Sequence, residues 1–290
     1  MVKFSKKEIE MFELVRTKTR KEAKDLEKHF FDKKIRVLGV SGSARSINDM
    51  SKENSTSEWL LTNCLSQAKK LGAETEMISL RDFDIKPCKA CYSTTNAHCH
   101  YKCTCYPKGE YGDDMTNKLY DKCMWADVIV FATPINNFKI SSMMSLFIDR
   151  LISMDGSLSP ANPNDTKNVE LNKKHTDFIE ETATEKSGSG YLKRFNGKVA
   201  GIIVSGHEAG AAMTISQLFM TLNHYGFLFP PYSNMYAVAS VCNSTHHDKS
   251  ILINDCYKQE AKMLAKNLVT LAKLLKSTKN YSWDYSGKAD

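Results

Sequence analysis

Residues 35–59 read IRVLGVSGSARSINDMSKENSTSEW, and this stretch decides the fold. Its first six residues form an almost continuous apolar run, which is typical of a strand buried on both faces of a parallel sheet. A polar loop rich in Ser and Gly follows, and Ser55, Thr56 and Ser57 then open a helical pattern. A buried strand that leads through such a loop into a helix N-terminus predicts a binding turn for a phosphate.

The same alternation of strand and helix continues along the chain. Further strands are predicted at 75–80, 128–133, 199–205 and 235–241, and helices at 55–72, 115–127, 142–154, 213–226 and 249–275. Each connection is long enough for a crossover helix, so the strands are expected to be parallel and covered on both faces. The pattern predicts an α/β fold with a doubly wound, five-stranded parallel sheet. Ligands of such sheets bind beyond the carboxyl ends of the strands.

Three segments lie outside this core pattern. Residues 1–34 have apolar positions at helical spacing and predict an N-terminal helical extension, as one long helix or two short ones. Two roles are open for it: an arm that contacts another subunit, or a helix packed on its own domain. Within the domain at 35–276, residues 155–197 are polar and predict an inserted excursion with a short helix near 173–186. Residues 277–290 form a C-terminal tail.

Composition narrows the classes of function. The formal net charge is +7 with a sequence pI of about 8.8, which favours anionic small ligands and does not by itself indicate a nucleic-acid partner. No apolar run approaches the roughly 20 residues that a membrane span needs, and the N-terminus lacks the pattern of a signal peptide. We therefore expect a cytoplasmic protein whose thiols stay reduced.

Two motifs together resemble a known family. They are VLGVSGSARS, followed by STSEWLL, and FATPINNFKISSMMSLFIDRL at 131–151. The first loop is neither GxGxxG nor GxxxxGK[ST], which disfavours a dinucleotide-binding Rossmann domain and a nucleoside triphosphatase. Over about 35–275 the chain instead resembles the flavodoxin-like NAD(P)H-dependent FMN reductases and their iron–sulfur flavoprotein relatives. The resemblance implies a flavodoxin-like fold, FMN as cofactor and NAD(P)H as co-substrate.

The resemblance also implies which residues hold the flavin. The FMN phosphate would be bound by Ser41, Ser43, Arg45, Ser55, Thr56 and Ser57. The isoalloxazine ring would lie beside Pro134, Ile135, Asn136, Asn137 and Phe138, and its pyrimidine end near Ser205, Gly206, His207 and Gly210. The family often has an aromatic residue where this chain has Asn136. No catalytic residue is assigned, because the cofactor supplies the chemistry of hydride transfer and a protein acid is optional. Asp149 and Arg150 match a family Asp-Arg pair that we expect to support the helix end.

Five cysteines are concentrated in one segment after the second strand. They are Cys88, Cys91, Cys99, Cys103 and Cys105, spaced Cx2Cx7Cx3CxC. In the iron–sulfur branch this segment carries a [4Fe–4S] motif that opens with Cx2C, but its next cysteine falls where this chain has Thr94. Three alternatives are open: a [4Fe–4S] cluster, a zinc site to which His98 and His100 could contribute, or thiols and disulfides that only shape the loop.

The function predicted from these features is that of an FMN oxidoreductase. It would take hydride from NADH or NADPH and pass electrons to a quinone, a flavin, a metal centre or another small acceptor. The alternative is an electron-transfer protein that holds FMN, with or without an iron–sulfur cluster, and serves a protein partner. The resemblance implies a homo-oligomer, either a dimer or a tetramer. The sequence does not identify the acceptor or select NADH over NADPH.

Overall fold

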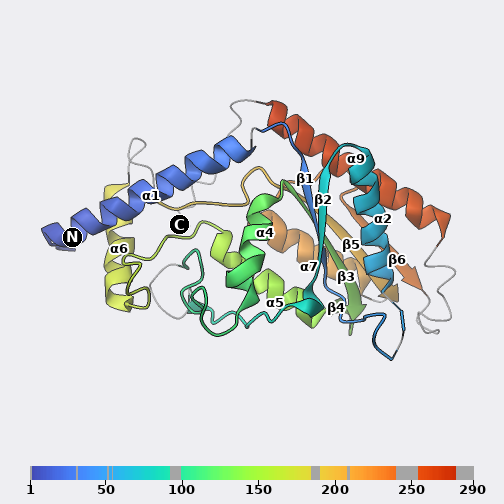
Figure 1. The fold of residues 1–290 in the computed structure, drawn as a ribbon, viewed down its shortest axis with the longest axis horizontal. Helices are drawn as coiled ribbons and strands as arrows, with labels where there is room; N and C mark the ends of the chain where they lie inside the picture. Colours follow the sequence, from blue (N-terminus) through green and yellow to red (C-terminus); the bar gives the residue numbers. More distant parts are fainter. Residues whose placement is uncertain are drawn as a thin grey trace.

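The fold is built around one parallel sheet. The computed structural model describes residues 2–30, 32–50, 52–53, 55–91, 99–183, 190–207, 210–239 and 254–278. In the described chain the parallel strands are β1 (Arg36–Ser41), β2 (Glu74–Ser79), β3 (Val128–Asn136), β5 (Val199–His207) and β6 (Asn234–Ala239). Their order in the sheet is β2-β1-β3-β5-β6 (Figure 1). All five predicted strands are confirmed, and this order is that of a flavodoxin-like doubly wound sheet.

The third strand runs further than predicted. The predicted strand ends at Thr133, just before Pro134, but β3 continues to Asn136 and folds back onto the two-residue strand β4 (Lys139–Ile140). Antiparallel pairs join Ile135 to Ile140 and Asn136 to Lys139. The two linking residues, Asn137 and Phe138, have φ values of 50° and 67°. Positive φ at both central residues is the signature of a two-residue hairpin turn, which explains why the chain reverses there.

Helices cover both faces of the sheet. One face carries α2 (Thr56–Lys70) and α9 (Asp255–Ser277), and the other carries α4 (Tyr120–Trp125), α5 (Ser142–Leu151) and α7 (Ala211–His224) (Figure 1). A π-helical turn at Met115–Leu119 precedes α4, and short 3-10 turns lie at Leu80–Asp82 and Ile152–Met154. Two apolar cores result, one on each face of the sheet. The alternation of apolar strands and amphipathic helices in the sequence therefore corresponds to the three layers of the fold, with the sheet between two layers of helices.

The N-terminal extension is a single helix, α1 (Lys6–Phe30), which packs on its own chain. Its Phe12 joins Phe178 of α6 (Val169–Thr182) in a third apolar cluster, and Figure 1 shows α1 and α6 together at one end of the molecule. Glu22 of α1 receives two hydrogen bonds from the buried Arg194, at 2.8 and 3.0 Å. Of the two roles that the sequence leaves open, packing on its own domain is the one observed; contact with another subunit stays a prediction.

Several helix boundaries differ from the predicted ones, and two of them are helix starts that differ by four residues or more. The helix in the excursion begins at Val169, four residues before the predicted start, because Asn168 caps it by accepting a 3.0 Å hydrogen bond from the Leu171 N–H. The last helix begins at Asp255, and residues 249–253 of its predicted start lie outside the described chain. Within the described residues, none of the helices combines the length and hydropathy required to cross a membrane.

Candidate functional site

The loop after β1 is held from two sides at its first glycine. The Gly42 N–H donates to the Ala132 carbonyl oxygen at 2.7 Å, and the Gly42 carbonyl oxygen accepts from the Ser141 Oγ at 2.6 Å. Ser141 also caps α5 by accepting from the Met144 N–H at 3.1 Å. A Cβ on Gly42 would lie 2.9 Å from the Cβ of Met144, so only glycine fits this approach. The loop therefore starts from a fixed point against α5.

The helix after the loop begins with a serine cap. Ser55 Oγ accepts a 3.3 Å hydrogen bond from the Glu58 N–H and lies 3.0 Å from Ser57 Oγ. The first N–H groups of α2, at Thr56 and Ser57, remain available to an anion because a helix leaves its first N–H groups without intrahelical partners. The positive end of the helix dipole favours a negative group at the same place. These features fit a phosphate.

The six residues predicted to hold the phosphate divide into four buried serines, among them the Ser55 and Ser57 described above, and two side chains with accessible polar groups. Ser41 and Ser43 are buried and engaged: Ser41 Oγ donates to Glu58 Oε2 at 2.8 Å, and Ser43 Oγ accepts from the Arg45 N–H at 3.2 Å. The exposed guanidinium of Arg45 and the half-buried hydroxyl of Thr56 have no hydrogen-bond or ion-pair partner in the described chain. Arg45 and Thr56 are therefore the side chains of this group that are ready to bind an anion.

The loops after β3 and β5 lie against each other beside the phosphate loop. Pro134 pairs in register with Ser205, and a Cβ on Gly206 would lie 3.0 Å from the Cβ of Ile135. Gly210 contacts the backbone of Phe138, whose side chain is 62% exposed. The predicted ring-binding residues are thus brought together at the carboxyl edge of the sheet, at the lower end of β3 in Figure 1. The side chain of His207 lies outside the described part of the chain.

The five clustered cysteines converge around Cys91. The Cys91 sulfur accepts hydrogen bonds from the thiols of Cys105 and Cys99, and the Cys103 sulfur accepts one from the Cys105 thiol. Acceptance of these bonds lowers the pKa of Cys91 and that of Cys103, whereas the pKa values of the donors Cys99 and Cys105 rise. Burial raises the pKa of Cys88. The eight cysteines within the described residues are all free thiols.

These thiols do not form a metal centre in this structure. No group of three or more His, Cys, Asp or Glu in the described ranges is arranged to hold a metal ion. His98, one of the two histidines that could enlarge a zinc site, lies outside those ranges, and the Nδ1 of His100 lies 3.2 Å from the Thr104 Oγ1. Hydrogen bonds join thiols of this segment to one another, and the three alternatives for its role stay predictions. We therefore derive no chemistry from a cluster.

The base of the cysteine segment is fixed by Arg150. Its guanidinium forms a bidentate pair with the fully buried Asp113, with N–O distances of 2.8 and 2.9 Å. It also donates to the Lys86 carbonyl oxygen at 2.8 Å and stacks 4.8 Å from the Tyr106 ring. Arg150 thus contacts the chain before Cys88 and after Cys105. The expected helix-end support is present, but its carboxylate comes from Asp113 and not from the adjacent Asp149.

Sequence reasoning missed two residues that contact the candidate phosphate loop and its neighbours, Glu58 of α2 and Arg81 of the turn after β2. Arg81 donates to both carboxylate oxygens of Glu58, at 2.5 and 3.0 Å, and to the Arg45 carbonyl oxygen at 3.0 Å. Burial opposes ionisation of Glu58, but the hydrogen bonds from Arg81 and Ser41 outweigh it and lower its pKa. One sequence signal could have indicated this pair. Glu58 lies in the first turn of a helix that is expected to face an anion, and a carboxylate there needs a positively charged partner.

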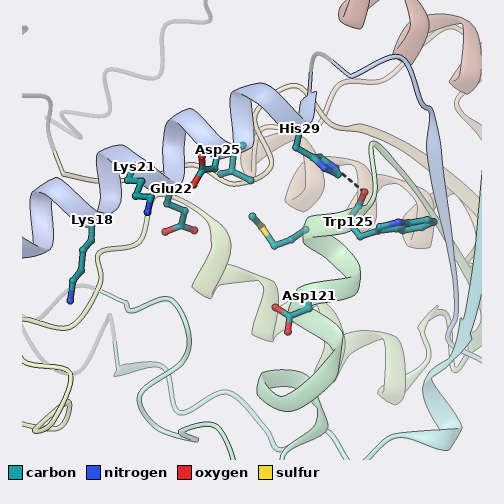
Figure 2. Close-up of a pocket in the computed structure, with 9 residues that line it drawn as sticks. Lys18, Lys21, Glu22, Asp25, His29, Asp121 and Trp125 are labelled. Atoms are coloured by element: carbon teal, nitrogen blue, oxygen red, sulfur yellow. Dashed lines mark hydrogen bonds between the residues drawn. The ribbon is translucent and has the colours of Figure 1, made fainter.

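A separate groove of about 600 Å³ lies between α1 and α4 (Figure 2). It is lined by Lys18, Lys21, Glu22, Asp25, Leu26, His29, Asp121, Met124 and Trp125. The His29 ring nitrogen lies 3.1 Å from the Trp125 carbonyl oxygen, three residues before β3 begins. The groove is therefore at the amino edge of the sheet, opposite the loops described above, and is not part of the same site.

Comparisons with known proteins match part of this chain to one family and to several relatives. Residues 35–174 match the family model described as NADPH-dependent FMN reductase. An iron–sulfur flavoprotein from Archaeoglobus fulgidus is 30% identical over 116 residues, which cover 40% of this chain and 48% of that protein. One from Methanosarcina thermophila is 25% identical over 118 residues, covering 41% of this chain and 53% of the relative. The chain thus spans about half the length of the curated relatives it matches.

Two solved structures share the fold. A crystal structure of RosB with bound 8-demethyl-8-formylriboflavin-5'-phosphate has a TM-score of 0.56 at 18% identity, over 84% of this chain and 81% of that one. A flavone reductase has a TM-score of 0.52 at 21% identity, over 85% and 66% of the two chains. At these identities the likeness supports the architecture alone. The comparisons thus show that residues 35–174 of this chain are similar to the NADPH-dependent FMN reductases, and that the chain shares the fold of these two flavin-related structures.

Proposed function

We propose that this protein is an FMN-dependent oxidoreductase that accepts hydride from NADH or NADPH and passes electrons to a small acceptor such as a quinone or a free flavin. The observation that carries the proposal is the meeting of three loops at one edge of the sheet. The Ser141–Gly42 hydrogen bond joins the loop after β1 to α5, and the Gly210–Phe138 contact joins the loops after β3 and β5. The match of residues 35–174 to the family model supports this class of reaction.

In this proposal the residues of the chain bind and orient the flavin. The Arg45 guanidinium, the Thr56 hydroxyl and the first N–H groups of α2 hold the phosphate by charge and hydrogen bonds. The rigid hairpin at Asn137 and Phe138 flanks the ring and presents backbone N–H groups to its polar edge. FMN, when bound, supplies the hydride-accepting chemistry, so the protein's contribution is position. No side chain is given a proton-transfer role.

Absorption spectroscopy tests the proposal. Protein purified with added FMN should show flavin absorption, and the flavin bands should bleach when NADH or NADPH is added without oxygen. Arg45→Ala should weaken FMN binding by about tenfold, as expected for loss of one charged hydrogen-bonding group. Arg20→Ala is the matched control, since it removes the same charge from an exposed position on α1. Protein that takes up no FMN contradicts the proposal.

Two further predictions from the resemblance are tested separately. Assembly into a dimer or tetramer is measured by light scattering of the purified protein. The cluster prediction draws no support from the described cysteines, and iron, sulfide and zinc analysis of anaerobically purified protein tests it. The metal analysis does not alter the flavin proposal, because the loops proposed to bind the phosphate and the ring contain none of the five clustered cysteines.

A further inference from the structure

Arg81 connects three parts of the phosphate site that are far apart in the sequence. It lies in the short turn after β2, and it donates to Glu58 in the first turn of α2 and to the backbone of the loop at Arg45. Glu58 in turn accepts the 2.8 Å hydrogen bond from Ser41 at the end of β1. A single guanidinium–carboxylate pair thus links β1, the loop, α2 and the turn after β2.

The pair is largely removed from water and is geometrically specific. The side chain of Glu58 is 5% exposed and that of Arg81 is 17% exposed. Two parallel N–H to O bonds fix the planes of both groups relative to each other, and such bidentate pairs are stronger and more directional than single contacts. The carboxylate cannot be a phosphate ligand, since two anions would repel. Its place in this site therefore calls for another role.

We propose that Arg81 and Glu58 are positioning residues that fix the phosphate-binding loop and so make the chain select FMN over riboflavin, which lacks the phosphate. The inference rests on the proposed function. Arg81 holds the backbone at Arg45 while the Arg45 side chain stays exposed toward solvent. Glu58 holds Ser41 and, through its own N–H, the cap at Ser55. Loss of either partner releases the loop without touching the ring-binding hairpin.

Two substitutions with opposite effects on charge separate positioning from simple attraction. Arg81→Met removes a positive charge near the phosphate and Glu58→Gln removes a negative one. Coulomb attraction alone predicts weaker FMN binding for the first variant and tighter binding for the second. Positioning predicts that both variants bind FMN more weakly, with riboflavin unchanged. The ratio of the riboflavin Kd to the FMN Kd should fall about tenfold in each, the scale of one lost charged hydrogen bond.

Further variants keep the test informative if Arg81→Met does not fold. Arg81→Lys preserves the charge but cannot make the bidentate pair, so the Kd ratio should fall for it as well. The matched control is Asp32→Asn, which breaks a bidentate pair with Arg36 at the opposite edge of the sheet, where the N–O distances are 2.5 and 3.2 Å. It should leave the ratio at the wild-type value. The double variant Arg81→Met/Glu58→Gln should cost little more than either single change.

Each outcome of the titrations decides a different point. A fall of the ratio in both single variants but not in the control supports the inference. Tighter FMN binding by Glu58→Gln, or equal loss of FMN and riboflavin in both variants, overturns it. A wild-type chain that prefers FMN while Arg81→Met keeps the full preference overturns the inference alone. A wild-type chain that binds neither flavin overturns the proposed function, and the inference with it.

Discussion

Gly210 lies directly against the backbone of Phe138. A Cβ placed on Gly210 would lie 2.6 Å from the Cα of Phe138 and 2.8 Å from its carbonyl oxygen. These atoms belong to the hairpin between β3 and β4, and they cannot move as the end of a flexible side chain can. The close approach therefore fixes the start of α7 relative to the hairpin that we propose flanks the flavin ring.

Gly210→Ala is expected to displace this hairpin and weaken FMN binding. The added methyl group must push the backbone aside, at a cost of about 1–3 kcal/mol in the free energy of unfolding. Gly72→Ala is a matched control, because Gly72 has φ of +88° against +87° for Gly210 but has no atom within 4 Å of its Cβ position. Both variants carry the same backbone strain, and only Gly210→Ala adds the clash. Equal FMN affinity in the two variants would show that the contact is irrelevant to the flavin site.

Asp113→Asn is expected to destabilise the protein strongly. It leaves the Arg150 guanidinium buried without a carboxylate, and such uncompensated charges cost about 3–5 kcal/mol. Asp255→Asn, in an exposed pair with Lys258, should change the free energy of unfolding by less than about 0.5 kcal/mol. Urea unfolding of the three proteins measures the difference. A small effect for Asp113→Asn would mean that Arg150 finds another acceptor and that the cysteine segment has a different anchor.

The same pair should make stability depend on acid. Burial opposes ionisation of Asp113, but the hydrogen bond from Arg150 outweighs it and lowers the pKa of the carboxyl. A carboxyl whose folded pKa lies below its unfolded pKa of about 3.9 contributes fully above that pH, and the contribution is lost as the pH falls through the folded pKa. We expect the wild-type advantage over Asp113→Asn to shrink below about pH 4. An advantage that persists undiminished at pH 2 would contradict this assignment.

The sheet and the order of its elements could be predicted from the sequence because their signal is local. Each strand is a short apolar run, and each helix repeats apolar residues on one face. The β3–β4 hairpin was missed because β4 has two residues, too few for any periodicity. The position of the phosphate loop followed in the same way from one strand and one helix cap.

The partners of the charged residues could not be predicted. Glu58 and Arg81 are 23 residues apart, and Asp113 and Arg150 are 37 apart. Each pair joins a loop or turn to a helix, and nothing in the periodicity indicates which carboxylate a given arginine will meet. The hydrogen bond from Ser41 to Glu58 could not be predicted for the same reason, because the two residues meet only when α2 packs beside β1. Tertiary contacts decide these pairs.

His175 is expected to weaken the attachment of α1 to α6 in mild acid. It is buried, stacks 4.9 Å from Phe12 of α1, and finds no hydrogen-bond partner among the described residues at either ring nitrogen. Burial, together with the nearby charges of His100 and Arg16, lowers the pKa of His175 to about 4. An unfolded histidine has a pKa of about 6.5. Between pH 6.5 and 4, His175 therefore binds a proton in the unfolded chain but stays neutral in the folded chain.

The contribution of His175 should therefore lower the free energy of unfolding as the pH drops through this window, by up to about 3 kcal/mol, and this contribution should level off below pH 4. His175→Phe keeps a planar ring beside Phe12 but cannot take a proton, so its free energy of unfolding should lose less over the same range. His224→Phe, at a side chain that is 79% exposed, should keep the wild-type slope. Urea unfolding at pH 7, 5.5 and 4 compares the three proteins. Parallel slopes for wild type and His175→Phe would show that the imidazole is not the group that titrates.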